Sequence, residues 1–500
     1  MTRASIQSAD TPHAVSGVQL MMGLGHQEAR GFWADAWSRV VRRPGAIFGL
    51  SWIAIVAFFA VFAPVLASGH PVLMSERMPD GSWGEPSSPL LRYLGAADIL
   101  LLLGGLAALP WILIPWTPRK STRAWALVVA AVQTGATVVL TKAIAALFGA
   151  QDAAPWMRDL EQSGAFAPAL SAAVAALCAI PTMLLGPLHR WRGNVVLALA
   201  VGIVAGAAVT ARWQDPLERF NYWPRAAAGE IRAVYTLIPF SPNQGETLLF
   251  TRPPGTRVGD GLSADTVIGS DAAKRYILGT DAFGQDVLSQ VMHACRLSIS
   301  IGLVSTTIAM LIGITMGAVM GYFGGWVDLL LYRVVEIVMA VPLLFLLIVA
   351  AAVLPRNTYV MMAIIGCFTW TNAARFTRAE FMKLRNQDFV QSARAVGLPL
   401  RSVLYKHMLP NGVTPVLVDA SFAIAVAILI EANLSFLGLG PAGQASWGKL
   451  LTSATGEAGT FLWWLAVFPG AAIFLTVLSY NLIGEALRDA IDPKLKKARV

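Results

Sequence analysis

Residues 45–67 read GAIFGLSWIAIVAFFAVFAPVLA, a run without a single charged side chain. An α-helix of about 20 apolar residues crosses the hydrocarbon core of a bilayer. The whole chain is 56% hydrophobic and only 13% charged, so it cannot cover its surface with polar groups in water. We therefore expect an all-α integral membrane protein with about ten transmembrane helices. In the hydrocarbon core there is no water to bond the backbone, and a helix satisfies its N–H and C=O groups internally.

The predicted spans alternate across the membrane in a way that their flanking charges support. The ten predicted spans are 45–67, 92–116, 124–149, 164–186, 194–212, 297–319, 329–353, 358–377, 413–437 and 461–484. Basic residues gather beside these runs at 119–123, 189–192, 375–406 and 494–499. With both termini in the cytoplasm, ten crossings place every one of these clusters inside, as the positive-inside rule requires.

This topology predicts five consecutive regions. They are a cytoplasmic segment 1–44, the first span 45–67, four helices within 68–212, an external element 213–296 and a membrane region 297–497. In the first region Trp33, Trp37, Val40 and Val41 recur at helical spacing, which indicates an amphipathic helix on the inner membrane surface. The external element is rich in Pro and Gly, and periodicity does not reveal its function.

Charge and cysteine content exclude some classes of function. The net charge of +9 comes from clusters beside apolar runs, and no basic stripe with interleaved aromatic residues suggests nucleic-acid binding. The three cysteines, Cys178, Cys295 and Cys367, are odd in number and far apart, so we expect neither a disulfide framework nor a metal site.

Segment 378–411 contains the most informative local pattern. A helix-compatible stretch ends at Gly397, a residue suited to the left-handed position after a helix. Pro399 then suits the first turn of a second helix, which we expect to end before Pro410. The pattern predicts two short helices joined by a glycine turn on the cytoplasmic side. Such a rigid projection could receive a push from a soluble motor, although an ordinary amphipathic loop would show the same pattern.

Several motifs in the second half of the chain resemble one known family. They are QSARAVG at 391–397 with LPN at 409–411, LGTD at 278–281 with GQDVLS at 284–289, GYFGGWVD at 321–328, LSFLGLG at 434–440 and SWG at 446–448. Together they resemble the second permease subunit of ATP-binding-cassette importers for dipeptides and oligopeptides, a family that includes nickel permeases. The resemblance covers 276–497 almost continuously and the first span more weakly.

The resemblance implies a six-helix permease core of the type I importer fold and a set of site residues. Those expected to couple to the ATPase are Gln391, Ser392, Ala393, Arg394, Ala395, Gly397, Leu398, Pro399 and Pro410. Those of the external motif are Gly279, Thr280, Asp281, Gly284 and Asp286. Gln391 replaces the usual Glu and Gln285 the usual Arg, which puts the polar contacts of both motifs in question.

The resemblance also implies the partners. They are a second permease subunit, two cytoplasmic ATPases that use ATP and magnesium, an extracytoplasmic solute-binding protein and the lipid of a bacterial inner membrane. The chain itself is expected to be no enzyme and to bind no cofactor. Residues 443–449 have the Gly and Lys spacing of a phosphate-binding loop, but Leu450 replaces the Ser or Thr that would hold magnesium.

The family has six spans, so this chain carries four more between its first and second core helices. An even number of added helices keeps every later element on its original side of the membrane. Two other functions stay open: a secondary transporter, which would need intramembrane ion-coupling residues and inverted repeats, and a membrane scaffold or sensor. Among importers, peptide, nickel and other small solutes remain possible cargoes.

A few residues inside the spans are singled out by their chemistry. Gly313, Gly317 and Gly321 recur every four residues, which predicts a face for close helix packing. The carboxylates Glu336, Asp419 and Glu431 should face protein or a water-filled path, since a charge in lipid is costly. Asp98 and Lys142 lie at similar depth in consecutive helices, and we expect them to form an ion pair.

The topology predicts opposite accessibility for two engineered cysteines. After the three natural cysteines are replaced by serine, Ser121→Cys should react with an impermeant maleimide only from the cytoplasmic side, and Ser270→Cys only from outside. Reaction of either cysteine from the other side would contradict an even number of added helices.

Overall fold

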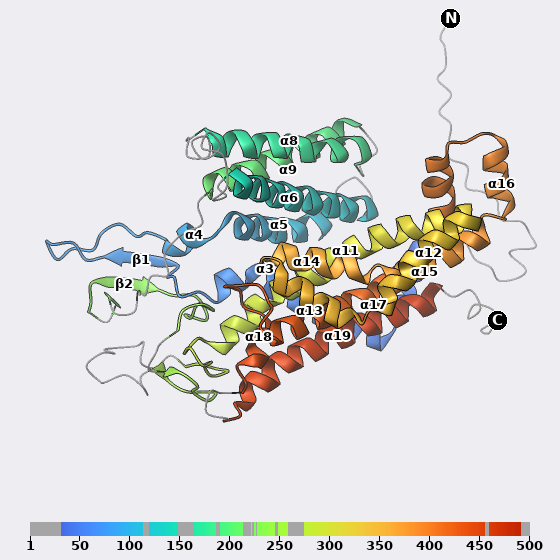
Figure 1. Ribbon diagram of the computed structural model, residues 1–500. Coiled ribbons are helices and arrows are strands. Elements are labelled where there is room, and N and C mark those ends of the chain that lie inside the picture. The colour runs from blue at the N-terminus through green and yellow to red at the C-terminus, as the bar shows by residue number, and fades with distance from the viewer. Residues whose placement is uncertain are drawn as a thin grey trace, which may run out of the picture.

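The computed structural model is a bundle of long helices that run roughly side by side, as Figure 1 shows. It describes residues 32–113, 120–148, 165–186, 191–213, 222, 225–226, 228–245, 249–258, 275–455 and 460–491. The loops and a small sheet gather at one end of the bundle, and helix α16, Asp388–Ala395, projects at the other. These are called below the sheet end and the α16 end. Ser270 and the basic tail lie outside the described residues.

The ten predicted spans all coincide with helices. The elements that form them are α3 Pro44–Leu66, α5 Ala96–Leu113, α6 Lys120–Phe148, α8 Phe166–Leu185, α9 Trp191–Ala211, α11 Val287–Phe323, α12 Gly325–Ala340 with α13 Leu343–Val353, α14 Thr358–Thr369 with α15 Thr371–Leu384, α17 Leu409–Phe436 and α19 Trp463–Ile491. Within the described residues, seven helices are long and apolar enough to cross a membrane, and α12 with α13 makes an eighth. The apolar stretches of α5 and α14 are shorter. The protein is thus an all-α integral membrane protein.

Two of the spans are each made of two helices. The seventh is broken between α12 and α13, whose axes differ by 82°. Pro342 causes the break, because proline has no N–H to donate and disfavours helical geometry at the residue before it. Val341 accordingly has extended backbone angles, with φ −87° and ψ 128°. The eighth span changes at Trp370 from α14 to α15, which continues to Leu384.

The predicted glycine face of α11 is confirmed. A β-carbon built on Gly313 would lie 2.6 Å from Cβ of Ala373, and one on Gly317 would lie 2.6 Å from Cβ of Thr377. One on Gly321 would lie 2.5 Å from Cβ of Phe381. No real side chain fits at such distances, so α11 and α15 touch backbone to backbone along three turns.

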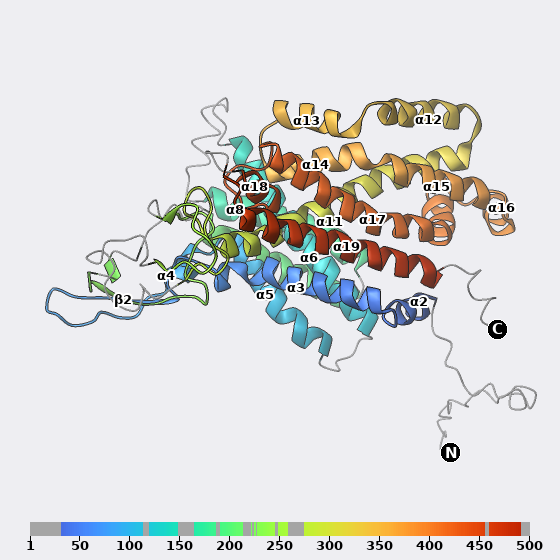
Figure 2. The ribbon, with the colours of Figure 1, turned by 90° about the horizontal axis from the view of Figure 1, so that it is seen from below.

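The four added helices form a bundle of their own beside the core. Figures 1 and 2 show α5, α6, α8 and α9 on one side of α3 and α11. The bundle meets the core through α5, where a β-carbon on Gly105 would lie 2.9 Å from a methyl group of Val61. Asp98 does not take the predicted partner: its carboxylate forms an ion pair with Arg296 of α11 and accepts a hydrogen bond from the Gly95 amide. The core thus supplies the nearer cation, and the pair joins the bundle to α11.

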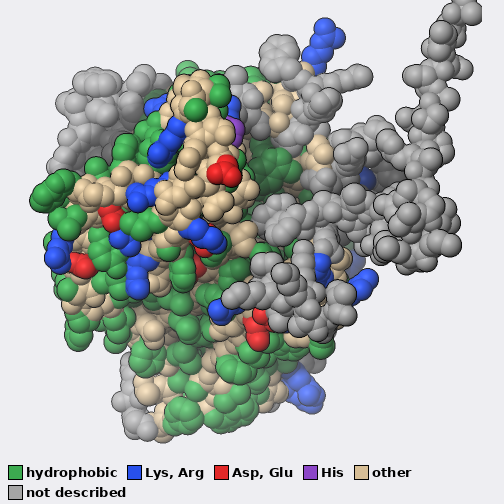
Figure 3. Space-filling model, turned by 90° about the vertical axis from the view of Figure 1, so that its right-hand side faces the viewer, with side chains coloured by type: hydrophobic (Ala, Val, Ile, Leu, Met, Phe, Trp, Pro, Cys, Tyr) green, Lys and Arg blue, Asp and Glu red, His purple; other side chains and the backbone are tan. Residues whose placement is uncertain are grey.

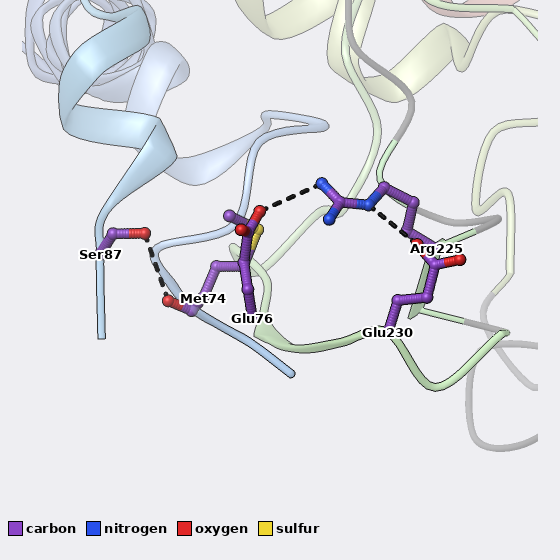
Figure 4. Close-up of polar contacts among 5 residues, drawn as sticks. All are labelled: Met74, Glu76, Ser87, Arg225 and Glu230. Atoms are coloured by element: carbon purple, nitrogen blue, oxygen red, sulfur yellow. Dashed lines mark hydrogen bonds and ion pairs between the residues drawn. The ribbon is translucent and has the colours of Figure 1, made fainter. Parts of the chain in front are cut away.

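A two-stranded sheet closes the chain around the added bundle. Strand β1, Leu73–Glu76, pairs antiparallel with β2, Ile231–Val234, so that Leu73 lies opposite Val234. β1 precedes the bundle and β2 follows it, hence the four helices are inserted between two paired strands. Figure 4 shows Arg225 bonded to Glu76 and Glu230, each at 3.1 Å, while Ser87 donates to the Met74 carbonyl.

Three further short helices belong neither to the spans nor to the hairpin that contains α16. They are α2 Phe32–Val40, α4 Pro89–Tyr93 and α18 Trp447–Thr452. α2 coincides with the predicted amphipathic helix and buries Ala36 and Val40 against Ala486 and Ala490 of α19. Trp37, in contrast, is 55% exposed, which suits a ring at a membrane surface.

The glycine contact predicts a large effect from a single methyl group. Gly317→Ala should destabilise the folded protein by about 1–3 kcal/mol, because the methyl group must push α15 away. Gly135→Ala is the matched control, since nothing lies within 4 Å of a β-carbon built there in α6. Thermal unfolding of the two purified variants in detergent measures the difference, and equal midpoints would contradict the close contact.

Candidate functional site

A helical hairpin at the α16 end is the strongest candidate for a functional site. It consists of α16, Asp388–Ala395, and a π-helical segment, η4, Ser402–Met408. Figure 1 shows α16 beyond the ends of the long helices, and Figure 3 views the molecule from this end. Five apolar side chains of the hairpin are exposed: Phe389, Val396, Leu398, Leu400 and Tyr405.

Gly397 forms the turn that the sequence predicts. Its φ is +78°, in the left-handed region. The Gly397 amide donates to the Arg394 carbonyl at 2.9 Å, and the Leu398 amide donates to the Ala393 carbonyl at 3.2 Å. This pair of hydrogen bonds is the Schellman motif, which satisfies carbonyls that a helix end leaves without donors. The turn therefore fixes the direction in which the chain leaves α16.

Pro399 starts the second arm of the hairpin. Its carbonyl accepts hydrogen bonds from the amides of Ser402 and Val403. The second arm does not end before Pro410, as was expected, but runs directly into α17. The wider π-helical turns make this possible: the Leu409 amide bonds five residues back to Leu404, and Pro410 falls in the first turn of α17, where its missing N–H is tolerated.

The hairpin is firmly attached to the long helices. A shared apolar cluster contains Ala318 of α11, Phe381 and Leu384 of α15, Val390 and Ala393 of α16, and Val403, Leu404 and Met408 of η4. In addition, the Arg394 guanidinium lies 4.3 Å from the ring centre of Tyr322 and donates a hydrogen bond of 3.1 Å to its hydroxyl. A displacement of the hairpin is thus passed to α11 and α15.

Four residues expected to contact a motor subunit differ in their exposure. Gln391 donates its side-chain amide to the Asn386 carbonyl at 3.2 Å, so it supports the loop before α16. Ser392 and Ala395 are exposed, whereas Ala393 is 7% exposed and belongs to the apolar cluster. The exposed side chains of α16 at positions 391, 392 and 395 are therefore uncharged, and position 391 carries no carboxylate.

The motif Gly279–Asp286 forms a buried joint at the sheet end. The Asp281 carboxylate accepts hydrogen bonds from the amides of Phe283 and Gln285 and from the Gln290 side chain. Thr280 donates to the Leu249 carbonyl at 2.6 Å. Asp286 caps α11 by accepting from the Ser289 amide at 2.7 Å, and burial raises its pKa to about 7. The joint is structural: it fixes the start of α11.

Two glycines let the chain of this joint turn and approach closely. Gly279 and Gly284 have φ values of +81° and +70°. A β-carbon on Gly279 would lie 2.6 Å from the Arg252 carbonyl oxygen. The substitution of Arg by Gln at 285 leaves the joint intact, since the backbone of Gln285, not its side chain, bonds Asp281.

The intramembrane polar residues do not converge on one site. Glu431 is fully buried and accepts hydrogen bonds of 2.7 Å from Ser435 and Ser446, so it links α17 to the start of α18. Glu336 pairs with Arg333 one turn earlier on the exposed face of α12. Asp98 lies at the junction with the added bundle, and Lys142 lies within that bundle, on α6. Asp419 is partly exposed on α17.

Two contacts that sequence reasoning missed lie in the motif GYFGGWVD. Tyr322 receives Arg394, and Asp328 accepts two hydrogen bonds from Arg378 of α15, at 2.5 and 2.7 Å. The motif was recognised by resemblance alone. Its aromatic and acidic side chains, facing a basic segment 50 or more residues later, were the available signal.

Comparison with known proteins identifies two matching families. Residues 313–497 match the family described as binding-protein-dependent transport system inner membrane component, and residues 31–79 match the N-terminal transmembrane domain of oligopeptide transport permease C. Residues between 79 and 313, which include the added bundle, fall outside both matches.

Similar proteins of known name are also transport permeases. A dipeptide transport system permease protein from Alkalihalophilus pseudofirmus is 36% identical over 44% of this chain and 72% of its own length. An oligopeptide transport system permease protein from Bacillus subtilis is 32% identical over 57% of this chain and 90% of its own. A glutathione transport system permease protein from Pectobacterium atrosepticum is 36% identical over 62% of this chain and all of its own length.

The Gly397 turn predicts a sharp distinction between two substitutions. Gly397→Val should abolish transport while the protein still inserts, because a β-branched residue in a left-handed conformation costs about 1–2 kcal/mol and opens the turn. Gly397→Asn should retain most transport, since Asn tolerates this conformation and nothing lies within 4 Å of a β-carbon there. Uptake normalised to folded protein tests this, and equal uptake by both variants would contradict it.

Proposed function

Because this chain belongs to the family of binding-protein-dependent transport system inner membrane components, we propose that it forms half of the pore of an ATP-driven peptide importer. As a member of that family it is a multi-pass transport permease of the ATP-binding-cassette class. The observation that carries the proposal is the hairpin at the α16 end, because its exposed apolar side chains offer a surface that a partner protein could bind.

We propose that ATPase subunits bind this hairpin in the cytoplasm. Phe389, Val396 and Leu398 are exposed there outside the membrane region, where apolar surface usually marks a protein contact. The cluster beneath them and the Arg394–Tyr322 contact connect the hairpin to α11 and α15. Motion of ATPases during ATP binding and hydrolysis would thus reach both long helices. The chain itself would bind neither ATP nor magnesium.

Peptides are the proposed cargo. Two of the relatives are named as dipeptide and oligopeptide permeases, and one is named for glutathione, itself a peptide. A second permease subunit would complete the pore, and a solute-binding protein would deliver the peptide at the sheet end. We place the chain in a bacterial inner membrane with the α16 end in the cytoplasm, in agreement with the basic residues of segment 375–406.

Substitution of one exposed apolar residue tests the ATPase contact. Val396 is 79% exposed on the hairpin, and Val396→Asp should reduce the amount of ATPase that copurifies with the chain at least tenfold. Leu237→Asp is the matched control, since Leu237 is 82% exposed at the opposite, sheet end. Stoichiometric ATPase in the wild type and in the control, but not in Val396→Asp, is the expected result. A chain that copurifies with no ATPase in any form would contradict the proposed importer.

A further inference from the structure

One partly buried carboxylate in the membrane region, Asp419, lacks the partners that most of the others have. The paired carboxylates are Asp98 with Arg296, Asp328 with Arg378, Glu336 with Arg333, and Glu431 with Ser435 and Ser446. Asp419 of α17 has no such contact: within the described part of the chain, no side chain or amide donates to it. Its side chain is neither fully buried nor fully exposed. A charge in this situation needs water or a cation from outside the chain.

Asp419 lies at the edge of the side of α17 that the described part of the chain covers least. At 100° per residue, the exposed residues Val426 and Asn433 lie within about 40° of Asp419 around the helix, and Asn411 lies about 80° away. The opposite side carries the buried residues Ile428, Glu431 and Ser435. α15 and α19 pack against the two flanks of α17, as Figure 2 shows.

The chemistry of this side of α17 differs from that of the other exposed surface in the core. The exposed residues of α12 and α13 are largely apolar, among them Trp326, Ile337, Phe345 and Val349, as a surface against lipid or another helix should be. The side of α17 near Asp419 carries this carboxylate and two carboxamides among exposed apolar residues such as Leu429 and Phe436. Glu336 of α12 has Arg333 beside it, whereas the carboxylate of Asp419 requires water or a cation from outside the chain.

We propose that this side of α17 lines the aqueous translocation path, and that Asp419 there contacts a cationic group of the transported solute. An ammonium or guanidinium group is the chemical class that an unpaired carboxylate recognises. The inference rests on the proposed function, because a path exists only if the chain is half of a pore. It goes beyond that function by assigning the lining helix and a residue that favours cationic solutes.

Thiol labelling of the assembled importer tests the path and the charge together. Val426→Cys, in a background without the three natural cysteines, reports on this side of α17 about 10 Å from Asp419 along the helix. It should react with both a cationic and an anionic methanethiosulfonate reagent during turnover. At low salt, where charges act over about 30 Å, Asp419→Asn should lower the cation-to-anion rate ratio by about threefold or more.

A second carboxylate of the membrane region, Glu336, provides the control. Glu336→Gln, which removes the in-helix partner of Arg333, should leave the ratio unchanged. Asn433→Cys provides a second reporter on the same side of α17 if Val426→Cys does not assemble. Absence of labelling at the assembled reporter would overturn the proposal, because this side would then lie against lipid or the second permease. Normal labelling with an unchanged ratio would overturn the role of Asp419.

A transport measurement separates this inference from the proposed function. Asp419→Asn should lower uptake of trilysine at least threefold more than uptake of trialanine, each compared with the wild type. Comparison with the wild type cancels any preference of the solute-binding protein. Equal losses for both peptides would overturn the selectivity. If the wild type transports neither peptide, the proposed cargo fails, while the labelling result still decides whether α17 lines a water-filled path.

Discussion

The backbone contact between α11 and α15 is the constraint on which the rest of the core depends. Gly313, Gly317 and Gly321 bring the two helices so close that neither can slide or roll without a clash. In a bilayer, where lipid is as apolar as a leucine side chain, such close packing supplies much of the attraction between helices. α11 and α15 therefore behave as one rigid unit, and what is fixed to either helix is fixed to both.

This rigid unit joins the two ends of the molecule. α11 is 37 residues long, about 55 Å at 1.5 Å per residue. Its first residue is held by the buried joint of Asp281 and Asp286, and its last turns contact the hairpin through Tyr322 and Arg394. A displacement of the hairpin would thus be transmitted along α11 to the buried joint. The 82° bend between α12 and α13 lies outside this rigid unit.

The sequence predicted those parts whose physics is local. The apolar runs located all ten helices, since span length is set by the bilayer. Gly397 located the turn, because only a left-handed residue ends α16 in this way. The partner of Asp98 was predicted wrongly: equal depth on neighbouring helices suggested Lys142, but Arg296, almost 200 residues later, lies beside it. Side-chain pairs between distant segments depend on packing that periodicity does not encode.

The attachment of the added bundle explains how a core of this kind can carry four more helices. The chain passes through β1 before the bundle and through β2 after it, and these two strands pair with each other. The bundle is therefore joined to the core through a two-stranded sheet. It touches α3 near Gly105 and α11 through Asp98 and Arg296, and neither contact involves the hairpin. The glycine contact between α11 and α15 lies nearer the α16 end than Arg296 does. The bundle can therefore follow the sheet end of α11 without obstructing the connection between the hairpin and the core.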